Sequence, residues 1–273
     1  MNQDLNMTTF FMRFSFWKSA VFFALTLFLL NSCAAPPVIS LLERPTRDAL
    51  LTRLDASRTA YSSMRGLGKY RFSQGGKSFS ATQVLLVQKP DKLRVETFGL
   101  FGSLAMLLTT DGEQLTVLLP GEGKAYQGEA SSRVLQRFMQ LPLREEDIVA
   151  ILLQRPLLTA WDDDEIRYDS DGNSALILKN AYGVRQEILF DPQLNIVGFD
   201  YYLADGLQMR LLYNEFDQKT RFAHQFQLTL PLDELEISFT FSEVDLNTTL
   251  PIERFRLTVP AGYTPLPLYK ESR

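Results

Sequence analysis

The second half of the chain alternates between apolar and polar positions with a period of two residues. The clearest stretches are residues 222–230, 235–242 and 254–259, in which large apolar side chains alternate with polar or small ones. Because successive side chains of a strand point to opposite faces, this pattern predicts antiparallel strands with one apolar face and one face in water. Asp171-Gly172 and Asp205-Gly206 are among the turn signals that separate such stretches.

The first half carries strands of another kind. Residues 84–87, 104–108 and 115–119 are apolar at nearly every position, so both faces of each predicted strand are apolar. Strands of this composition are covered on both sides or line a cavity. Turn signals such as Gly75-Gly76 and Asp111-Gly112 separate them.

Two regions have helical periodicity instead. The first is predicted at residues 47–64, with Thr46 as the N-cap and Gly66 and Gly68 as the stop. Its apolar stripe consists of Leu50, Leu54, Tyr61 and Met64. The second lies at residues 131–154 and is interrupted by Pro142. Its two stripes consist of Val134, Leu135, Phe138, Met139 and Leu141, then Ile148, Ile151 and Leu152.

The order of these elements predicts one α+β domain over residues 46–273. A helix precedes five or six strands, the helical insert follows, and about six strands complete the chain without a linker in residues 66–268. We expect one strongly curved sheet, an incomplete antiparallel β-barrel or half-barrel. In this prediction the helices at 47–64 and 131–154 form a lid over its apolar concave face.

The N-terminus has the pattern of a lipoprotein signal peptide. Arg13 and Lys18 precede an apolar run at residues 20–30, and small residues lead to Cys33, the only cysteine of the 273 residues. Residues 1–32 are therefore predicted to be the signal peptide, and the proline-bearing residues 33–45 to be a tether that begins at a lipidated cysteine. Met1, Met7 and Met12 all remain possible starts.

Two alternatives compete with the lipidated cysteine. A transmembrane helix needs roughly 17–25 apolar residues, and this uninterrupted run is shorter. An ordinary secreted protein would keep an odd thiol in an oxidising compartment. The lipobox-like end favours acylation, and Ala34 in place of Asp after the cysteine resembles an outer-membrane address in Gram-negative bacteria.

Composition argues against several kinds of chemistry. The net charge is −4 without a basic block, which argues against nucleic-acid binding. One histidine and one cysteine leave too few ligands for a zinc site of those residue types. His224 falls in register with apolar residues, so we expect it to be structural. Residues 162–165 and 169–173 are expected to be solvated turns rather than calcium sites, and we predict no enzyme, metal or cofactor.

The chain resembles the LolB-type outer-membrane lipoprotein receptors, or more broadly the LolA/LolB fold. The resemblance rests on GLGKYRFSQGGKSFSATQVLLVQKPDKLRVETFGLFGSLAMLLTTDGEQLTVLLP at residues 66–120 and on LQRFMQLPLREEDIVAILL at residues 135–153. Phe101-Gly102-Ser103 is similar to the Leu-Gly-Ser loop of that family, whose protruding leucine is associated with cargo delivery. The extra C-terminal strands have no counterpart in the receptors.

The resemblance implies a function in lipoprotein sorting. It implies acylated lipoproteins as cargo, a soluble periplasmic carrier as partner, and a place on the periplasmic face of the outer membrane. Leu100 and Phe101 are then the membrane-inserting or cargo loop. The residues proposed for the wall of an acyl cavity are Val84, Leu86, Leu104, Met106, Leu115, Val117, Phe138 and Met139.

Two other functions stay open. An anchored structural or sensor lipoprotein of the same fold would have a filled core and no ligand. An envelope hydrolase is the third hypothesis, although no pair of carboxylates is singled out by its spacing. A large apolar void under the helices would favour the receptor, and a packed interior would favour the structural protein.

Overall fold

The computed structural model describes residues 44–268. Its helices are α2 Arg47–Ala60, α3 Ser132–Met139 and α4 Glu145–Leu152, with short 3-10 turns η1 Leu100–Gly102, η2 Pro120–Glu122, η3 Pro231–Asp233 and η4 Ile252–Arg254. Its strands are β1 Ser63–Gln74, β2 Lys77–Gln88, β3 Lys92–Phe98, β4 Leu104–Thr110, β5 Gln114–Leu119, β6 Lys124–Glu129, β7 Asp163–Tyr168, β8 Ser174–Lys179, β9 Val184–Phe190, β10 Ile196–Leu203, β11 Gly206–Phe216, β12 Ala223–Leu230, β13 Leu235–Leu246 and β14 Thr264–Pro267. The predicted signal peptide, Cys33 and most of the predicted tether lie outside the described residues.

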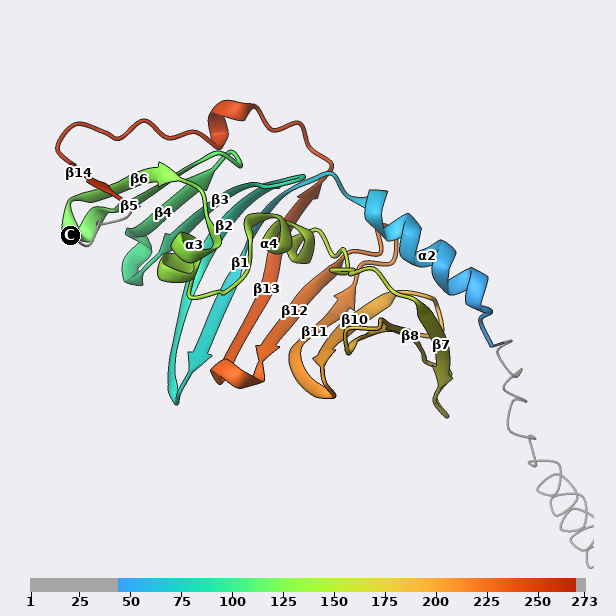
Figure 1. Ribbon diagram of the computed structural model, residues 1–273. Coiled ribbons are helices and arrows are strands. Elements are labelled where there is room, and N and C mark those ends of the chain that lie inside the picture. Colours follow the sequence, from blue (N-terminus) through green and yellow to red (C-terminus); the bar gives the residue numbers. More distant parts are fainter. Residues whose placement is uncertain (1–43, 269–273) are drawn as a thin grey trace, which may run out of the picture. The chain divides into compact units, whose positions relative to one another are not determined.

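The described strands form one large, twisted and curved sheet of 14 strands (Figure 1). Hydrogen-bonded neighbours follow the order β14-β6-β5-β4-β3-β2-β1-β13-β12-β11-β10-β9-β8-β7. Neighbours are antiparallel throughout, apart from the parallel pair β14 and β6. β14 and β7 are the two edges, so the sheet is open and not closed into a barrel.

The two halves of the chain meet at β1 and β13. β1 pairs with β2 on one side and with β13 on the other, so the first and last long strands lie side by side in the middle of the sheet. The pairing shifts register at Leu67 and Gly68. A Cβ atom at Gly68 would lie 2.3 Å from the carbonyl oxygen of Thr240. Glycine at this position therefore allows the close approach of β13.

Helix α2 begins as predicted but ends earlier. The Thr46 hydroxyl accepts a hydrogen bond from the backbone N–H of Ala49 at 3.3 Å, which confirms the predicted N-cap. The helix ends at Ala60, and Met64 belongs to β1, where it is fully buried. The prediction of helix up to Met64 is wrong. Met64 continues the apolar spacing of the helix, so the sequence pattern does not show where the helix ends. In the structure, hydrogen bonds with β2 and β13 make the chain from Ser63 onward a strand.

The C-terminal segment departs from the prediction of a strand at residues 254–259. The chain there has no strand pairing and instead crosses one face of the first half-sheet, before β14 pairs with β6 (Figure 1). Leu257, Val259 and Tyr263 pack on a small core of buried residues in β4–β6, which consists of Leu107, Leu118 and Ala125. An extended chain with one covered face alternates like a strand, so the sequence pattern does not separate the two.

An ion pair fixes this C-terminal segment. The Arg256 guanidinium donates to the Asp111 carboxylate at 2.7 Å. Burial alone raises the pKa of Asp111, but hydrogen bonds from the backbone of Gln114, the Arg256 guanidinium and the backbone of Glu113 outweigh it and hold this pKa at about 2. The lowered pKa contributes stability above the usual pKa of an aspartate, and that contribution is lost as the pH falls from about 4 towards 2.

The helical insert lies against the opposite, concave face. The predicted break at Pro142 is confirmed, since α3 and α4 flank it. Five consecutive residues of α4, Ile148 to Leu152, are buried, and they join the main core of the sheet through Ile148, Val149, Ile151 and Leu152. Figure 1 shows both helices in front of the middle strands. The candidate functional site therefore lies between α4 and the concave face of the sheet.

Candidate functional site

Helix α4 is held to the sheet at its C-terminal end. The buried side chain of Gln154 donates to the carbonyl oxygen of Ala223 at 2.7 Å and accepts from its backbone N–H at 2.8 Å. The Tyr213 hydroxyl, also buried, donates to the carbonyl oxygen of Ile151 at 2.8 Å. Three hydrogen bonds thus fix this end of α4 to β11 and β12.

The N-terminal end of α4 has contacts of another kind. Asp147 caps it by accepting from the backbone N–H of Arg144 at 3.3 Å and from the Arg144 guanidinium at 3.1 Å. These bonds lie within the helix itself and leave Arg144 exposed. Residues 140–144 before the helix have no regular structure, and Gln140 adopts a φ of 58°. The C-terminal end of α4 is fixed to the sheet by hydrogen bonds, whereas its N-terminal end contacts the sheet through the apolar side chains of Leu141, Leu143 and Ile148 alone.

A cavity of about 570 Å³ opens beside this N-terminal end. This volume lies in the range of roughly 300–1,000 Å³ that is typical of small-molecule sites. Its apolar wall comes from the α3–α4 connection, residues 156–158 and the strands. The apolar residues that line it are Pro142, Leu143, Ala150, Pro156, Leu157, Leu158, Met209 and Leu230, with Tyr201 beside them.

The charged rim of this cavity is uneven. Arg144 is paired with Asp147 at 3.1 Å and with Glu146 at 3.7 Å. Arg58 and Arg155 also line the cavity, and within residues 44–268 neither has an ion-pair partner. Asp233 lines the same cavity, and its carboxylate also has no ion-pair partner in this range. An apolar wall beside two unpaired arginines and one unpaired aspartate suits an apolar molecule with a polar head group.

The space directly beneath α4 is much smaller. It measures about 50 Å³ and is lined almost entirely by apolar side chains from α4 and from both halves of the sheet. Since one water needs roughly 10–15 Å³ of such space, this volume holds only a few water-sized molecules. In this conformation, the interior between α4 and the sheet is packed.

The structure brings five of the eight proposed wall residues to the concave core. Leu115 and Val117 are buried there, and Met106, Phe138 and Met139 are partly buried side chains that pack against the same core. Val84 and Leu86 lie on the other face, because their neighbour Leu85 lines the space beneath α4. Leu104 packs on the small core under the C-terminal segment. The register shift between Thr97 and Phe98 opposite β4 leaves Ala105 unpaired, which turns Leu104 to that face.

Several residues of the concave wall were not predicted from the sequence. They are Leu85, Val95, Phe226, Leu228, Ile237 and Phe239 around the small space, and Met209, Leu157 and Leu158 around the larger cavity. Alternation in residues 222–230 and 235–242 gave the signal for four of them. It marks one apolar face on each strand, although it does not show which helices cover that face.

Phe101 stands at the tip between β3 and β4. Its side chain is fully exposed, with 103 % of the reference area accessible, and its φ of 64° lies in the left-handed region. Such a φ is uncommon for a bulky residue and costs roughly 1–2 kcal/mol. A large apolar side chain held in water on a strained backbone is the kind of feature that accompanies a functional contact.

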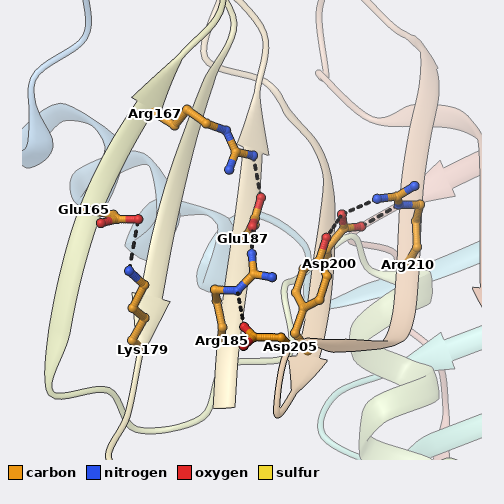
Figure 2. A network of polar contacts seen from close by, with 9 residues as sticks. Glu165, Arg167, Lys179, Arg185, Glu187, Asp200, Asp205 and Arg210 are labelled. Atoms are coloured by element: carbon orange, nitrogen blue, oxygen red, sulfur yellow. Dashed lines mark hydrogen bonds and ion pairs between the residues drawn. The ribbon is translucent and has the colours of Figure 1, made fainter. Parts of the chain in front are cut away.

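The outer face of β7–β11 carries a polar network (Figure 2). Buried Glu187 lies between Arg167, at 2.5 Å, and Arg185, and buried Asp200 forms two hydrogen bonds with Arg210 at 2.8 and 2.6 Å. Hydrogen bonding to Asp200 raises the pKa of Arg210. Because each buried carboxylate has its cation, the network holds neighbouring strands together and leaves no free group for chemistry.

Metal-binding clusters and membrane-spanning helices are both absent from residues 44–268. No cluster of three or more His, Cys, Asp or Glu side chains there could hold a metal ion. No helix in that range is both long and apolar enough to span a bilayer. His224 is half-buried, with its ring centroid 6.2 Å from that of Phe222.

The comparisons with known proteins identify the fold. No protein-family model and no curated protein sequence matches the chain. Among solved structures, a DUF1329 family protein from Desulfovibrio piger superposes with a TM-score of 0.51 and 18 % identity, covering 76 % of this chain and 94 % of that one. An outer membrane lipoprotein-sorting protein domain from Vibrio parahaemolyticus gives 0.50 and 15 %, covering 76 % and 94 %.

A LolA superfamily protein from Nitrosomonas europaea also superposes, with a TM-score of 0.50 and 17 % identity, covering 78 % of this chain and 98 % of that one. The chain therefore has the fold of the LolA superfamily. This confirms the resemblance to the LolA/LolB fold that the sequence predicted.

Proposed function

We propose that the protein is a lipid-anchored envelope protein that binds the acyl chains of lipoproteins and helps insert lipoproteins into the outer membrane. The observation that carries the proposal is the cavity of about 570 Å³ on the concave face, with an apolar wall and two unpaired arginines. The fold supports it, since proteins of this fold include one described as a lipoprotein-sorting domain. A soluble periplasmic carrier is the proposed donor of cargo, and no catalytic step is proposed.

Acyl binding requires movement of the helical segment. One chain of about 16 carbons has a transfer free energy of roughly 12 kcal/mol at about 0.8 kcal/mol per methylene. The space of about 50 Å³ beneath α4 is too small for it. We propose that residues 140–147 swing out about the fixed end at Gln154, which withdraws Leu141 and Leu143 from the core, so that the two spaces join. The helices then act as a lid over the concave face.

Phe101 is proposed to contact the membrane during delivery. Its exposed ring would contribute roughly 1.5–3 kcal/mol on entering the bilayer. The change Phe101→Glu is expected to leave folding and acyl binding unchanged while reducing transfer of a bound lipoprotein to liposomes at least about tenfold, the loss that this energy corresponds to.

Transfer is measured by sedimentation of labelled lipoprotein with liposomes. Phe101→Leu is the matched control and keeps transfer. If Phe101→Glu transfers normally, the delivery role of the tip is wrong. Leu100, predicted with Phe101 as the tip, belongs to the same turn η1.

The proposed anchor is Cys33. Its sulfur would carry one diacylglyceryl group, whose two acyl chains hold the protein at the membrane, since stable attachment takes two or more chains. Cys33→Ser is therefore expected to abolish incorporation of radiolabelled palmitate and to release the protein into the soluble fraction. Labelling that persists in this variant would contradict the assignment.

The packed interior beneath α4 favours a second candidate function. A structural or sensor lipoprotein with the same fold needs no ligand, and a space of about 50 Å³ under the helix fits it. Purification from the native envelope separates the two. Acyl species that co-purify with the protein support the receptor function. A protein that carries no ligand but still maintains the integrity of the cell envelope supports the structural role.

A further inference from the structure

The exposed apolar side chains are distributed unevenly over the sheet. Within residues 44–268, the large apolar residues that remain exposed are Phe79, Phe101, Trp161, Tyr182, Leu203 and Leu232. Phe101, Tyr182 and Leu232 lie on turns, after β3, β8 and β12, and Leu203 is the last residue of β10. Phe79 lies two residues beyond the first residue of β2, and Trp161 lies two residues before β7.

The strand registers place all six at the same end of the sheet. β1 turns into β2 at Gln74, which pairs with Lys77 and with Leu235 at the start of β13. The same end continues through Leu230 of β12 and the β10–β11 turn at Leu203. It reaches β7 through the ends of β9 and β8. We call this end the apolar end; the β1–β2 turn and η3 lie along it in Figure 1.

The opposite end of the sheet is polar. Its turns, after β2, β4, β7, β9 and β11, each contain an aspartate, namely Asp91, Asp111, Asp169, Asp191 and Asp217. All but the first of these accept a hydrogen bond from the backbone N–H two residues later, at 2.9–3.1 Å. These are the hydrated turns that loops in water normally form. The apolar end also carries aspartates, at Asp205 and Asp233, but the exposed large apolar side chains of residues 44–268 all lie at that end, and these side chains need a reason.

Three of the exposed residues lie on segments that contact one another. The backbone N–H of Ala204 donates to the carbonyl oxygen of Gly183 at 3.0 Å, which joins the turns of Leu203 and Tyr182. Asn180 donates to the carbonyl oxygen of Ala160 at 3.3 Å, which brings in the segment of Trp161. Tyr182 is 87 % exposed, Leu203 47 % and Trp161 38 %. We call Trp161, Tyr182 and Leu203 the rim cluster.

We propose that the rim cluster docks on the surface of a lipid bilayer. The three exposed side chains come from three separate segments, before β7, after β8 and at the last residue of β10, so each can enter a soft, uniform partner independently. Trp and Tyr are the residues that favour the membrane–water interface, where the ring lies among apolar groups and its polar atom stays hydrated. A folded protein partner would need a matching surface with fixed pockets instead.

The proposed anchor allows this docking, and the inference rests on it. The described chain begins at Arg44, whose guanidinium lies 5.2 Å from the ring centroid of Tyr168 at the last residue of β7. Trp161 lies just before the other end of the same six-residue strand, which is about 20 Å long. The 11 residues from Cys33 to Arg44 can span at most about 40 Å. An anchored chain can therefore bring the rim cluster to the membrane.

The sequence provides a direct probe of this contact. The sequence has two tryptophans, Trp17 and Trp161, and Trp17 lies in the predicted signal peptide, so Trp161 is the single tryptophan of the lipidated chain that begins at Cys33. This lipidated protein is reconstituted into vesicles of phosphatidylethanolamine and phosphatidylglycerol, part of which carry brominated acyl chains. We expect brominated lipid to quench Trp161 and acrylamide to quench it at least about threefold less in vesicles than in detergent, because the bilayer excludes the aqueous quencher.

Matched variants test which residues carry the contact. Tyr182→Ser with Leu203→Ser is expected to abolish quenching by brominated lipid, whereas Tyr182→Phe with Leu203→Ile preserves it. Flotation with vesicles reports the anchor at Cys33 separately, so a failed anchor is not mistaken for failed docking. A floating protein whose Trp161 stays fully open to acrylamide overturns the proposal. Protection from acrylamide without bromine quenching does so as well, and assigns the cluster to a protein contact.

Discussion

Gln154→Ala is expected to lower the free energy of unfolding by about 2–6 kcal/mol. The alanine removes two hydrogen bonds and leaves the N–H and the carbonyl oxygen of Ala223, both buried, without these partners. Each buried group left unsatisfied costs about 1–3 kcal/mol. The loss is measured by urea unfolding of the full chain, followed by the circular dichroism of the sheet.

Gln140→Ala is the matched control for this change. Gln140 also follows a helix and also has a positive φ, 58° against 54° for Gln154, but it is exposed. The backbone effect of alanine at a positive φ is therefore shared, and the difference between the two variants reports the buried hydrogen bonds. Equal stability of the two variants would show that α4 is not fixed to the sheet through Gln154.

Met209→Trp is expected to weaken acyl binding at least about tenfold, which corresponds to about 1.4 kcal/mol. Met209 is 7 % exposed and lines the cavity of about 570 Å³, so a larger ring at this position occupies space that a ligand needs. Because the cavity has room for the ring, the melting temperature should change little. Binding is measured by titration with a dansyl-labelled fatty acid and displacement with palmitate.

Met209→Leu conserves the side-chain volume and serves as the control, with binding close to that of the unchanged protein. If Met209→Trp binds the labelled fatty acid normally, the ligand does not occupy this cavity. If both variants lose binding equally, the effect comes from the strand and not from the filled space.

The sequence predicted where helices and strands lie better than it predicted which face of the sheet each side chain occupies. Thr46 and the break at Pro142 marked the helices correctly, because capping and proline act locally. Val84 and Leu86 were placed on the wrong side of the sheet for a wall under α4. Residues 84–87 are all apolar, so alternation carries no information there. Gln83 added to the error, since this polar side chain is buried on the concave side and donates to the Thr97 hydroxyl at 3.1 Å.

The larger cavity could not be predicted from local pattern. Its wall combines the α3–α4 connection with residues 155–159 and strands β10–β12, which lie up to about 90 positions apart in the chain. Arg58 and Arg155 gave no signal, because an arginine on a helix or loop normally faces water. The pairing register of the strands brings these segments together, and this register cannot be read from the amino-acid composition.

The central claim is that the concave side of the sheet binds acyl chains. Native mass spectrometry of the full-length protein, purified from its own envelope in mild detergent, tests it most directly. The account predicts species whose added mass equals one or more acylated ligands, that persist in Met209→Leu and that disappear in Met209→Trp. If the unchanged protein and both Met209 variants carry only the mass of their own lipid anchor, the claim is contradicted and the structural role is the function that remains.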